Sequence, residues 1–157
     1  MKLRLVILFA VLYAVPANAL EIMHKVKTSI GVFDACEETF LYSFKQDKSY
    51  YVKTTLNTSG TFGTLYPLQS QYEAYGKTDK QKFLPQKYTR TTKTRFNDRR
   101  KDIIYENGIP QYRISVKNGY ERKDDIVVDE KYASSNDLLT TMAEMAAHIN
   151  RTGNCDF

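Results

Sequence analysis

The strongest constraint on the fold is an alternation of apolar and polar side chains that recurs along most of the chain. In residues 36–44, Phe40, Tyr42 and Phe44 fall on one side of an extended backbone and mostly polar side chains fall on the other. Residues 50–57 repeat the pattern after a short polar connection. A period of two is typical of half-buried strands, and two such runs joined by a short turn predict an antiparallel hairpin.

Further strands are predicted on both sides of this hairpin. Two Asn-Gly pairs, Asn107-Gly108 and Asn118-Gly119, mark tight turns between them, since this dipeptide is a strong hairpin signal. The remaining runs with strand character are residues 22–28, 68–75, 87–96, 102–106, 111–117 and 126–128.

The periodicity changes near residue 137 and predicts one C-terminal helix. An N-cap is available from Ser134, Ser135 or Asn136, and Gly153 is placed to end the helix. The apolar stripe of this helix comprises Leu138, Leu139, Met142, Met145, Ala146 and Ile149.

The predicted fold is therefore mainly β, a curved antiparallel sheet or partial barrel of six to eight strands with one C-terminal amphipathic helix. An antiparallel sheet of this kind has one wet face and one face that needs cover. A single helix covers only part of that face, so the rest must curl inward, hold a ligand or meet a partner.

Residues 1–19 are predicted to be a secretory signal peptide, and residues 20–157 a single β-rich domain. Lys2 and Arg4 precede an apolar run from Leu5 to Val15, and Ala17-Asn18-Ala19 fits a cleavage site. The run is shorter than the roughly 20 residues that span a membrane. We therefore expect an exported protein in the periplasm of a Gram-negative bacterium, with membrane contact that is at most peripheral.

The charge of the chain is mildly basic. Removal of Lys2 and Arg4 with the leader lowers the formal net charge from +5 to +3. This charge alone does not imply a nucleic-acid partner, and the expected export argues against one.

The two cysteines, Cys36 and Cys155, allow one disulfide in an oxidising compartment. The alternative is that Cys36 is a buried free thiol, because it lies on the apolar side of a predicted strand.

The sequence holds no recognisable catalytic constellation. It contains no HExxH, CxxC or phosphate-loop motif, and neither His24 nor His148 lies in a nucleophile motif. The predicted protein is not an enzyme, and we expect no cofactor and no metal.

A basic segment spans residues 77–101, and within it Lys87, Lys93 and Arg95 share one side of a predicted strand. Such a basic surface can face an anionic partner. It can equally be a solvated strand face whose lysines discourage edge pairing.

Aromatic side chains are frequent and line either a ligand pocket or a filled core. If a pocket exists, the predicted ligand-binding residues are Phe40, Tyr42, Phe44, Tyr50, Val52, Leu56, Phe62, Tyr66, Leu139 and Met142. Phe62 and Tyr66 belong to the stretch 58–67, in which Gly60 and Gly63 predict positive φ or close backbone approach at a corner. This stretch is then either a structural corner or a lip of the pocket.

Several short motifs follow one another in a set order: Asn57-Thr58-Ser59-Gly60, Leu65-Tyr66-Pro67, Tyr75-Gly76, Leu84-Pro85, Ser135-Asn136-Asp137-Leu138-Leu139 and Gly153-Asn154-Cys155. Their order resembles an exported bacterial family known as domain of unknown function 3108, over most of Glu21 to Phe157. The resemblance implies a β-rich envelope protein and supplies no catalytic residues. The family has a proline where this chain has Leu138, and it continues past the cysteine. The resemblance therefore predicts that the chain is a short member or a fragment.

The function predicted from these observations is that of a non-enzymatic envelope protein that binds an apolar or lipid-like ligand in its curved sheet. A curved sheet with a helix across it is similar in shape to periplasmic lipoprotein carriers, although a shared shape does not establish function. The alternative is an interaction module with a filled core and no small ligand, which binds an envelope protein through a sheet edge or the basic surface.

Overall fold

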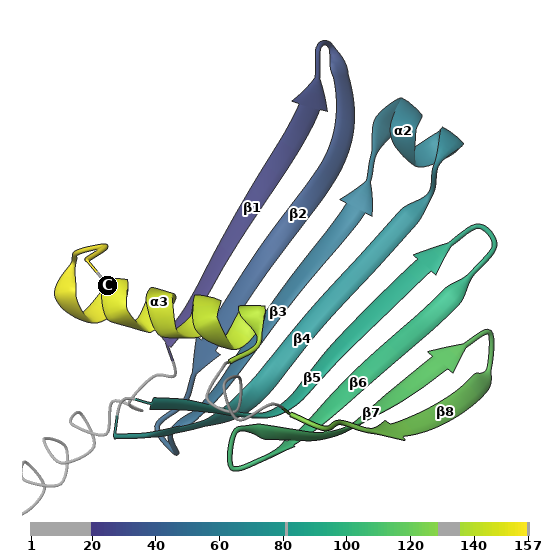
Figure 1. Cartoon of the computed structure of the whole chain (residues 1–157). Coiled ribbons are helices and arrows are strands. Elements are labelled where there is room, and N and C mark those ends of the chain that lie inside the picture. Colours follow the sequence, from purple (N-terminus) through teal and green to yellow (C-terminus); the bar gives the residue numbers. More distant parts are fainter. Residues whose placement is uncertain (1–19, 81, 129–135, 157) are drawn as a thin grey trace, which may run out of the picture.

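The computed structural model of the chain describes residues 20–80, 82–128 and 136–156. They form one open antiparallel sheet whose eight strands lie side by side in sequence order, with a helix across one face (Figure 1). The predicted fold class is confirmed. The elements are β1 (Leu20–Ile30), β2 (Phe33–Phe44), β3 (Ser49–Thr58), α2 (Gly60–Leu65), β4 (Leu68–Asp79), β5 (Lys82–Thr94), β6 (Asp98–Glu106), β7 (Ile109–Lys117), β8 (Tyr120–Asp125) and α3 (Leu138–Thr152).

The tight turns lie where the sequence predicts them, but the last strand does not. Asn107, Gly108, Asn118 and Gly119 all have positive φ, as a two-residue hairpin turn between β6 and β7 or between β7 and β8 requires. The predicted strand at 126–128 is wrong, because the chain returns directly after Gly119 and forms β8. Highly charged, β8 has little apolar alternation, which is typical of an exposed edge strand.

The sheet bends toward the face on which α3 lies, here called the inner face. A β-bulge in β5, where Gln86 is the extra residue opposite Tyr75 and Gly76, changes the register of β4 on β5, and bulges bend the strand that carries them. Beyond the bulge, Phe83 packs on Tyr50 with ring centroids 5.0 Å apart and borders a hollow that Thr141 of α3 also lines. The far end of the β4–β5 hairpin therefore curls toward the helix (Figure 1).

The core lies between α3 and the middle strands of the sheet. Val52 and Ala74 are direct partners in the register of β3 and β4, and Val52 has no exposed surface. Tyr50 reaches α3, where its hydroxyl lies 2.8 Å from Oγ1 of the buried Thr140. The buried apolar cluster comprises Tyr42, Tyr50, Val52, Ala74, Phe83, Leu139 and Ala143.

Helix α3 begins one to three residues later than the three predicted N-caps would place it. Asp137, rather than Asn136, is the N-cap, and its carboxylate accepts hydrogen bonds from Thr140 N at 3.0 Å and Thr140 Oγ1 at 2.7 Å. Ser134 and Ser135 lie outside the described residues. Gly153 ends the helix in the left-handed conformation, as predicted. Among the described residues, no helix has both the length and the apolar character needed to span a membrane.

We expect Asp137→Ala to lower the free energy of unfolding by about 1 kcal/mol, because it removes the N-cap hydrogen bond and a partner of the buried Thr140 hydroxyl. Asn136→Ala is the matched control and should change stability much less. Urea unfolding followed by circular dichroism measures both. Equal losses in the two variants would show that Asp137 is not the cap.

Candidate functional site

A groove with a volume of about 380 Å³ lies between α3 and strands β1 and β2. This volume is within the range of ligand pockets in proteins, about 300–1,000 Å³. Among the described residues that line it, none is Asp, Glu, Lys or Arg. The lining consists of Ile22, His24, Tyr42, Met142, Met145, Ala146, Ile149 and Asn150.

The groove arises because only the first half of α3 is fully packed on the sheet. Leu139 and Ala143 are buried, and α3 packs mainly on β3, β4 and β5. Toward its C-terminal end the helix continues past β1 (Figure 1). There Met145 and Ile149 stay 41% and 38% exposed, although they belong to the same apolar stripe. The stripe thus leaves apolar surface without a protein partner.

Of the ten residues predicted to bind a ligand, the structure places two in the groove, Tyr42 and Met142. Tyr50, Val52 and Leu139 lie in the filled core instead, because the curled β4–β5 hairpin and the first turns of α3 close over them. The others on the sheet are partly buried: Phe40 and Phe44, which pack against the core, and Leu56, which lies farther from α3.

Phe62 and Tyr66 lie at the other end of the sheet, in and after α2, and do not line the groove. Gly60 has a φ of +54°, and a Cβ on Gly63 would lie 2.8 Å from the Thr58 carbonyl oxygen. Both glycines therefore serve the corner as predicted, although the corner is a single helical turn that the sequence pattern does not reveal. Tyr66 is 71% exposed, so this stretch is a corner of the fold, remote from the groove.

Six groove residues are absent from the predicted ligand-binding set: Ile22, His24, Met145, Ala146, Ile149 and Asn150. Their signal is present in the sequence, since Met145, Ala146 and Ile149 continue the helical stripe and Ile22 and His24 alternate along the first strand. The sequence does not show that the second half of the stripe lies over β1 and β2 with less cover than the first.

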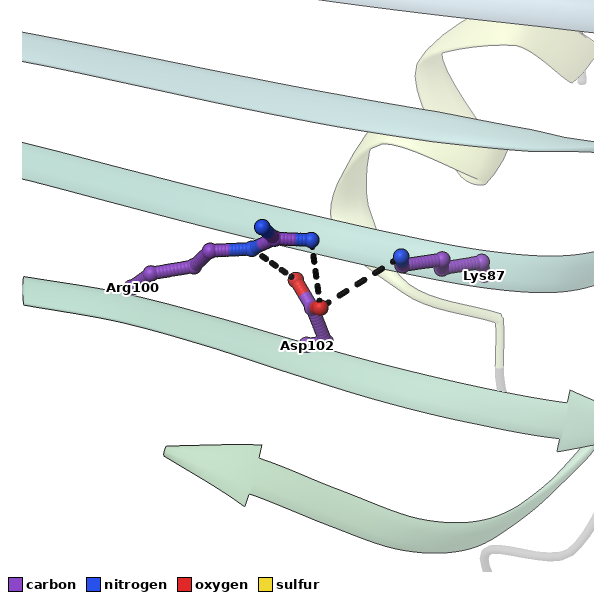
Figure 2. A network of polar contacts seen from close by, with 3 residues as sticks. All are labelled: Lys87, Arg100 and Asp102. Carbon is purple, nitrogen blue, oxygen red and sulfur yellow. Dashed lines mark hydrogen bonds and ion pairs between the residues drawn. The ribbon is translucent and has the colours of Figure 1, made fainter. Parts of the chain in front are cut away.

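The three residues of the predicted basic surface, Lys87, Lys93 and Arg95, lie in two separate environments. Lys87 lies on the outer face of the sheet, where its Nζ is 3.3 Å from Asp102 Oδ2 (Figure 2). Arg100 binds the same carboxylate through Nε at 3.0 Å and Nη2 at 2.8 Å. Lys93 and Arg95 are separate from this network and line a hollow beside α2, where Arg95 also donates a hydrogen bond to the Thr64 carbonyl oxygen.

Asp102 explains why Lys87 is not available to a partner. The residue is 6% exposed, and burial alone would raise the pKa of its carboxyl group. Hydrogen bonds from Arg100 and Thr89 and the charge of Lys87 outweigh burial and hold this pKa below its ordinary value. The three residues in Figure 2 are therefore a structural ion network that links β5 and β6.

Cys36 and Cys155 are free thiols in the structure. Cys36 pairs with Thr58 near the corner at α2, whereas Cys155 follows α3. The disulfide that the sequence allows is not formed, because Cys36 lies at the α2 end of β2, whereas α3, which Cys155 follows, packs near Tyr42 toward the other end of this strand. Cys36 is half-buried rather than fully buried.

The groove is thus an open, mainly apolar surface formed by a helix and two strands. It can bury an apolar group through its methionine, isoleucine and tyrosine side chains. Comparison of the chain with protein-family models, with curated proteins and with solved structures finds no match.

Proposed function

We propose that this protein is a non-enzymatic, exported protein of the cell envelope that binds an apolar or amphipathic, lipid-like ligand in the groove between α3 and β1–β2. The observation that carries the proposal is the exposed second half of the α3 stripe facing an apolar strand surface. Export is supported by the signal peptide that the sequence predicts at residues 1–19 and by the resemblance to an exported family.

Covering the exposed part of the α3 stripe with an apolar ligand is more favourable in free energy than leaving it in contact with water. Met145 and Ile149 remain partly exposed, whereas Leu139, Met142 and Ala146 of the same stripe are buried or half-buried. Leu138, which the sequence also assigns to the stripe, is 74% exposed at the start of the helix. Complete burial of such a side chain contributes about 1.5–3 kcal/mol. A bound alkyl chain that covers Met145 and Ile149 would gain part of this energy without any rearrangement of the sheet.

The test is a titration with an uncharged alkyl glycoside below its micelle concentration, followed by NMR of 13C-labelled methionine methyl groups. Met142 and Met145 line the groove, whereas Met23 is exposed on the outer side of β1 and serves as an internal reference. We expect the methyl signals of Met142 and Met145 to shift while that of Met23 stays unchanged.

The double variant Met145→Gln/Ile149→Gln should raise the dissociation constant about tenfold or more, which corresponds to about 1.4 kcal/mol. The matched control is Leu138→Gln/Val127→Gln, which replaces two exposed apolar side chains outside the groove. The proposal fails if the methyl signals of Met142 and Met145 do not move, or if the control weakens binding as much as the groove variant.

A further inference from the structure

The inner face of β5–β7 carries four positively charged side chains that form no ion pair with a carboxylate of the described residues. Arg90, Arg99, Lys101 and Lys117, here called the inner basic cluster, form no ion pair with any described residue. They line a hollow of about 380 Å³ together with the hydroxyl residues Thr92 and Ser115. The cluster is distinct from Lys87, which lies on the opposite face in the network with Asp102.

Strand register places these cations directly opposite one another. Arg90 pairs with Lys101 across β5 and β6, and Arg99 pairs with Lys117 across β6 and β7. Like charges at directly opposed positions of an antiparallel sheet are destabilising. Elsewhere on this face the chain does supply a counter-charge, since Asp124 Oδ2 lies 3.0 Å from Arg113 Nη2 and Asp124 Oδ1 lies 2.6 Å from Arg122 Nε.

A row of inner-face side chains connects this cluster to the apolar groove. His24, at the groove, is opposite Phe40, and the row continues through Thr54 and Tyr72 to Arg90. The guanidinium of Arg90 lies 5.4 Å from the ring centroid of Tyr72, so the cluster begins where the aromatic surface ends. Neighbouring strands are about 4.8 Å apart, which puts Phe40 and Arg90 about 14 Å apart.

We propose that the ligand is an anionic amphiphile, whose alkyl chain lies in the groove and along Phe40 and Tyr72 and whose anionic head group binds the inner basic cluster. This inference rests on the proposed function and adds the charge class of the ligand. An anionic head group would neutralise the two like-charge pairs, and Thr92 and Ser115 add neutral donors.

The experiment compares three probes by isothermal titration calorimetry: dodecyl phosphate, an uncharged dodecyl glycoside and inorganic phosphate. We expect dodecyl phosphate to bind at least tenfold more tightly than the glycoside at low ionic strength. This advantage should shrink as salt is added, because screening weakens exposed charge interactions. Inorganic phosphate, which lacks the chain, should bind at least tenfold more weakly than dodecyl phosphate.

The test variant is Arg99→Gln/Lys101→Gln, which should remove the preference for dodecyl phosphate and leave the affinity for the glycoside unchanged. The matched control is Lys25→Gln/Lys77→Gln, which removes two exposed positive charges from the outer face and should preserve the preference. Unfolding midpoints show whether each variant is folded, and relief of cation repulsion should keep the test variant at least as stable as wild type.

The outcomes separate this inference from the proposed function. Glycoside binding without a preference for dodecyl phosphate, or a preference that survives Arg99→Gln/Lys101→Gln, overturns the anionic ligand while the groove proposal stands. Equal binding of inorganic phosphate and dodecyl phosphate overturns the amphiphile, since the chain would then contribute nothing. If the glycoside does not bind, the groove proposal is overturned and this inference with it, whether or not inorganic phosphate binds.

Discussion

Replacement of Gly76 by alanine is expected to lower the free energy of unfolding by about 3 kcal/mol or more, the upper part of the range for overpacking. A Cβ at this position would lie 2.2 Å from the Leu84 carbonyl oxygen and 2.8 Å from both the Cε1 ring carbon and the hydroxyl oxygen of Tyr50. The first contact is with backbone at the bulge between β4 and β5, which cannot turn away as a side chain can. The gain from a less flexible unfolded chain, about 0.4–1 kcal/mol, is too small to offset it.

The destabilisation should extend to α3, because Tyr50 lies over Gly76 and its hydroxyl is hydrogen-bonded to Thr140 of this helix. Urea unfolding gives the stability change, and the methionine methyl spectrum reports whether α3 still packs on the sheet. The matched control is Gly31→Ala in the β1–β2 turn, where no atom lies within 4 Å of the added Cβ. Its positive φ costs about 1–2 kcal/mol, so a Gly76→Ala loss no larger than this would contradict the close-approach argument.

Replacement of Asp102 by asparagine should cost about 2 kcal/mol at neutral pH. The substitution keeps the volume but removes the charge that Lys87 and Arg100 share (Figure 2). Removing one partner of a fully buried ion pair costs about 3–5 kcal/mol, and the value is lower here because the side chain of Arg100 is half exposed. Asp124→Asn is the matched control, since that carboxylate also pairs with two cations, Arg113 and Arg122. Both are more open to solvent than Lys87, so the effect of this variant should be smaller.

The cost of Asp102→Asn should depend on pH in one direction. The folded state holds the pKa of Asp102 below its ordinary value of 3.8, so the unfolded state binds this proton more readily. The stabilising contribution is therefore complete above about pH 5 and is lost as pH falls below about 4, through the folded-state pKa. Urea unfolding of both proteins from pH 7 to pH 3 measures this, and a stability difference that stays constant at low pH would argue against an ionised, paired Asp102.

Local sequence patterns predict most of the elements because they depend on near neighbours. The alternation at Phe40, Tyr42 and Phe44 predicts β2, the two Asn-Gly turns predict the β6–β7 and β7–β8 hairpins, and the helical stripe predicts α3. The errors lie where local signals are weak, as in the charged strand β8 and in the single helical turn of α2. The sequence also predicts that one helix cannot cover the whole sheet.

The candidate site depends on contacts between residues far apart in the chain. Leu139 and Ile149 occupy the same stripe of α3, yet one is in the core and the other lines the groove, because only the first half of the helix is packed against the middle strands. Likewise, Lys87 and Arg90 belong to the same strand, but one faces Asp102 and the other faces Lys101.

The sequence by itself thus determines that the chain forms an antiparallel meander with a late amphipathic helix, since the periods of two and 3.6 are properties of the local backbone. Only the tertiary structure decides which cations meet and which apolar side chains stay uncovered. These outcomes depend on strand register and on the bulge in β5 opposite Gly76, and a shift of one residue would move every side chain of a strand to the other face.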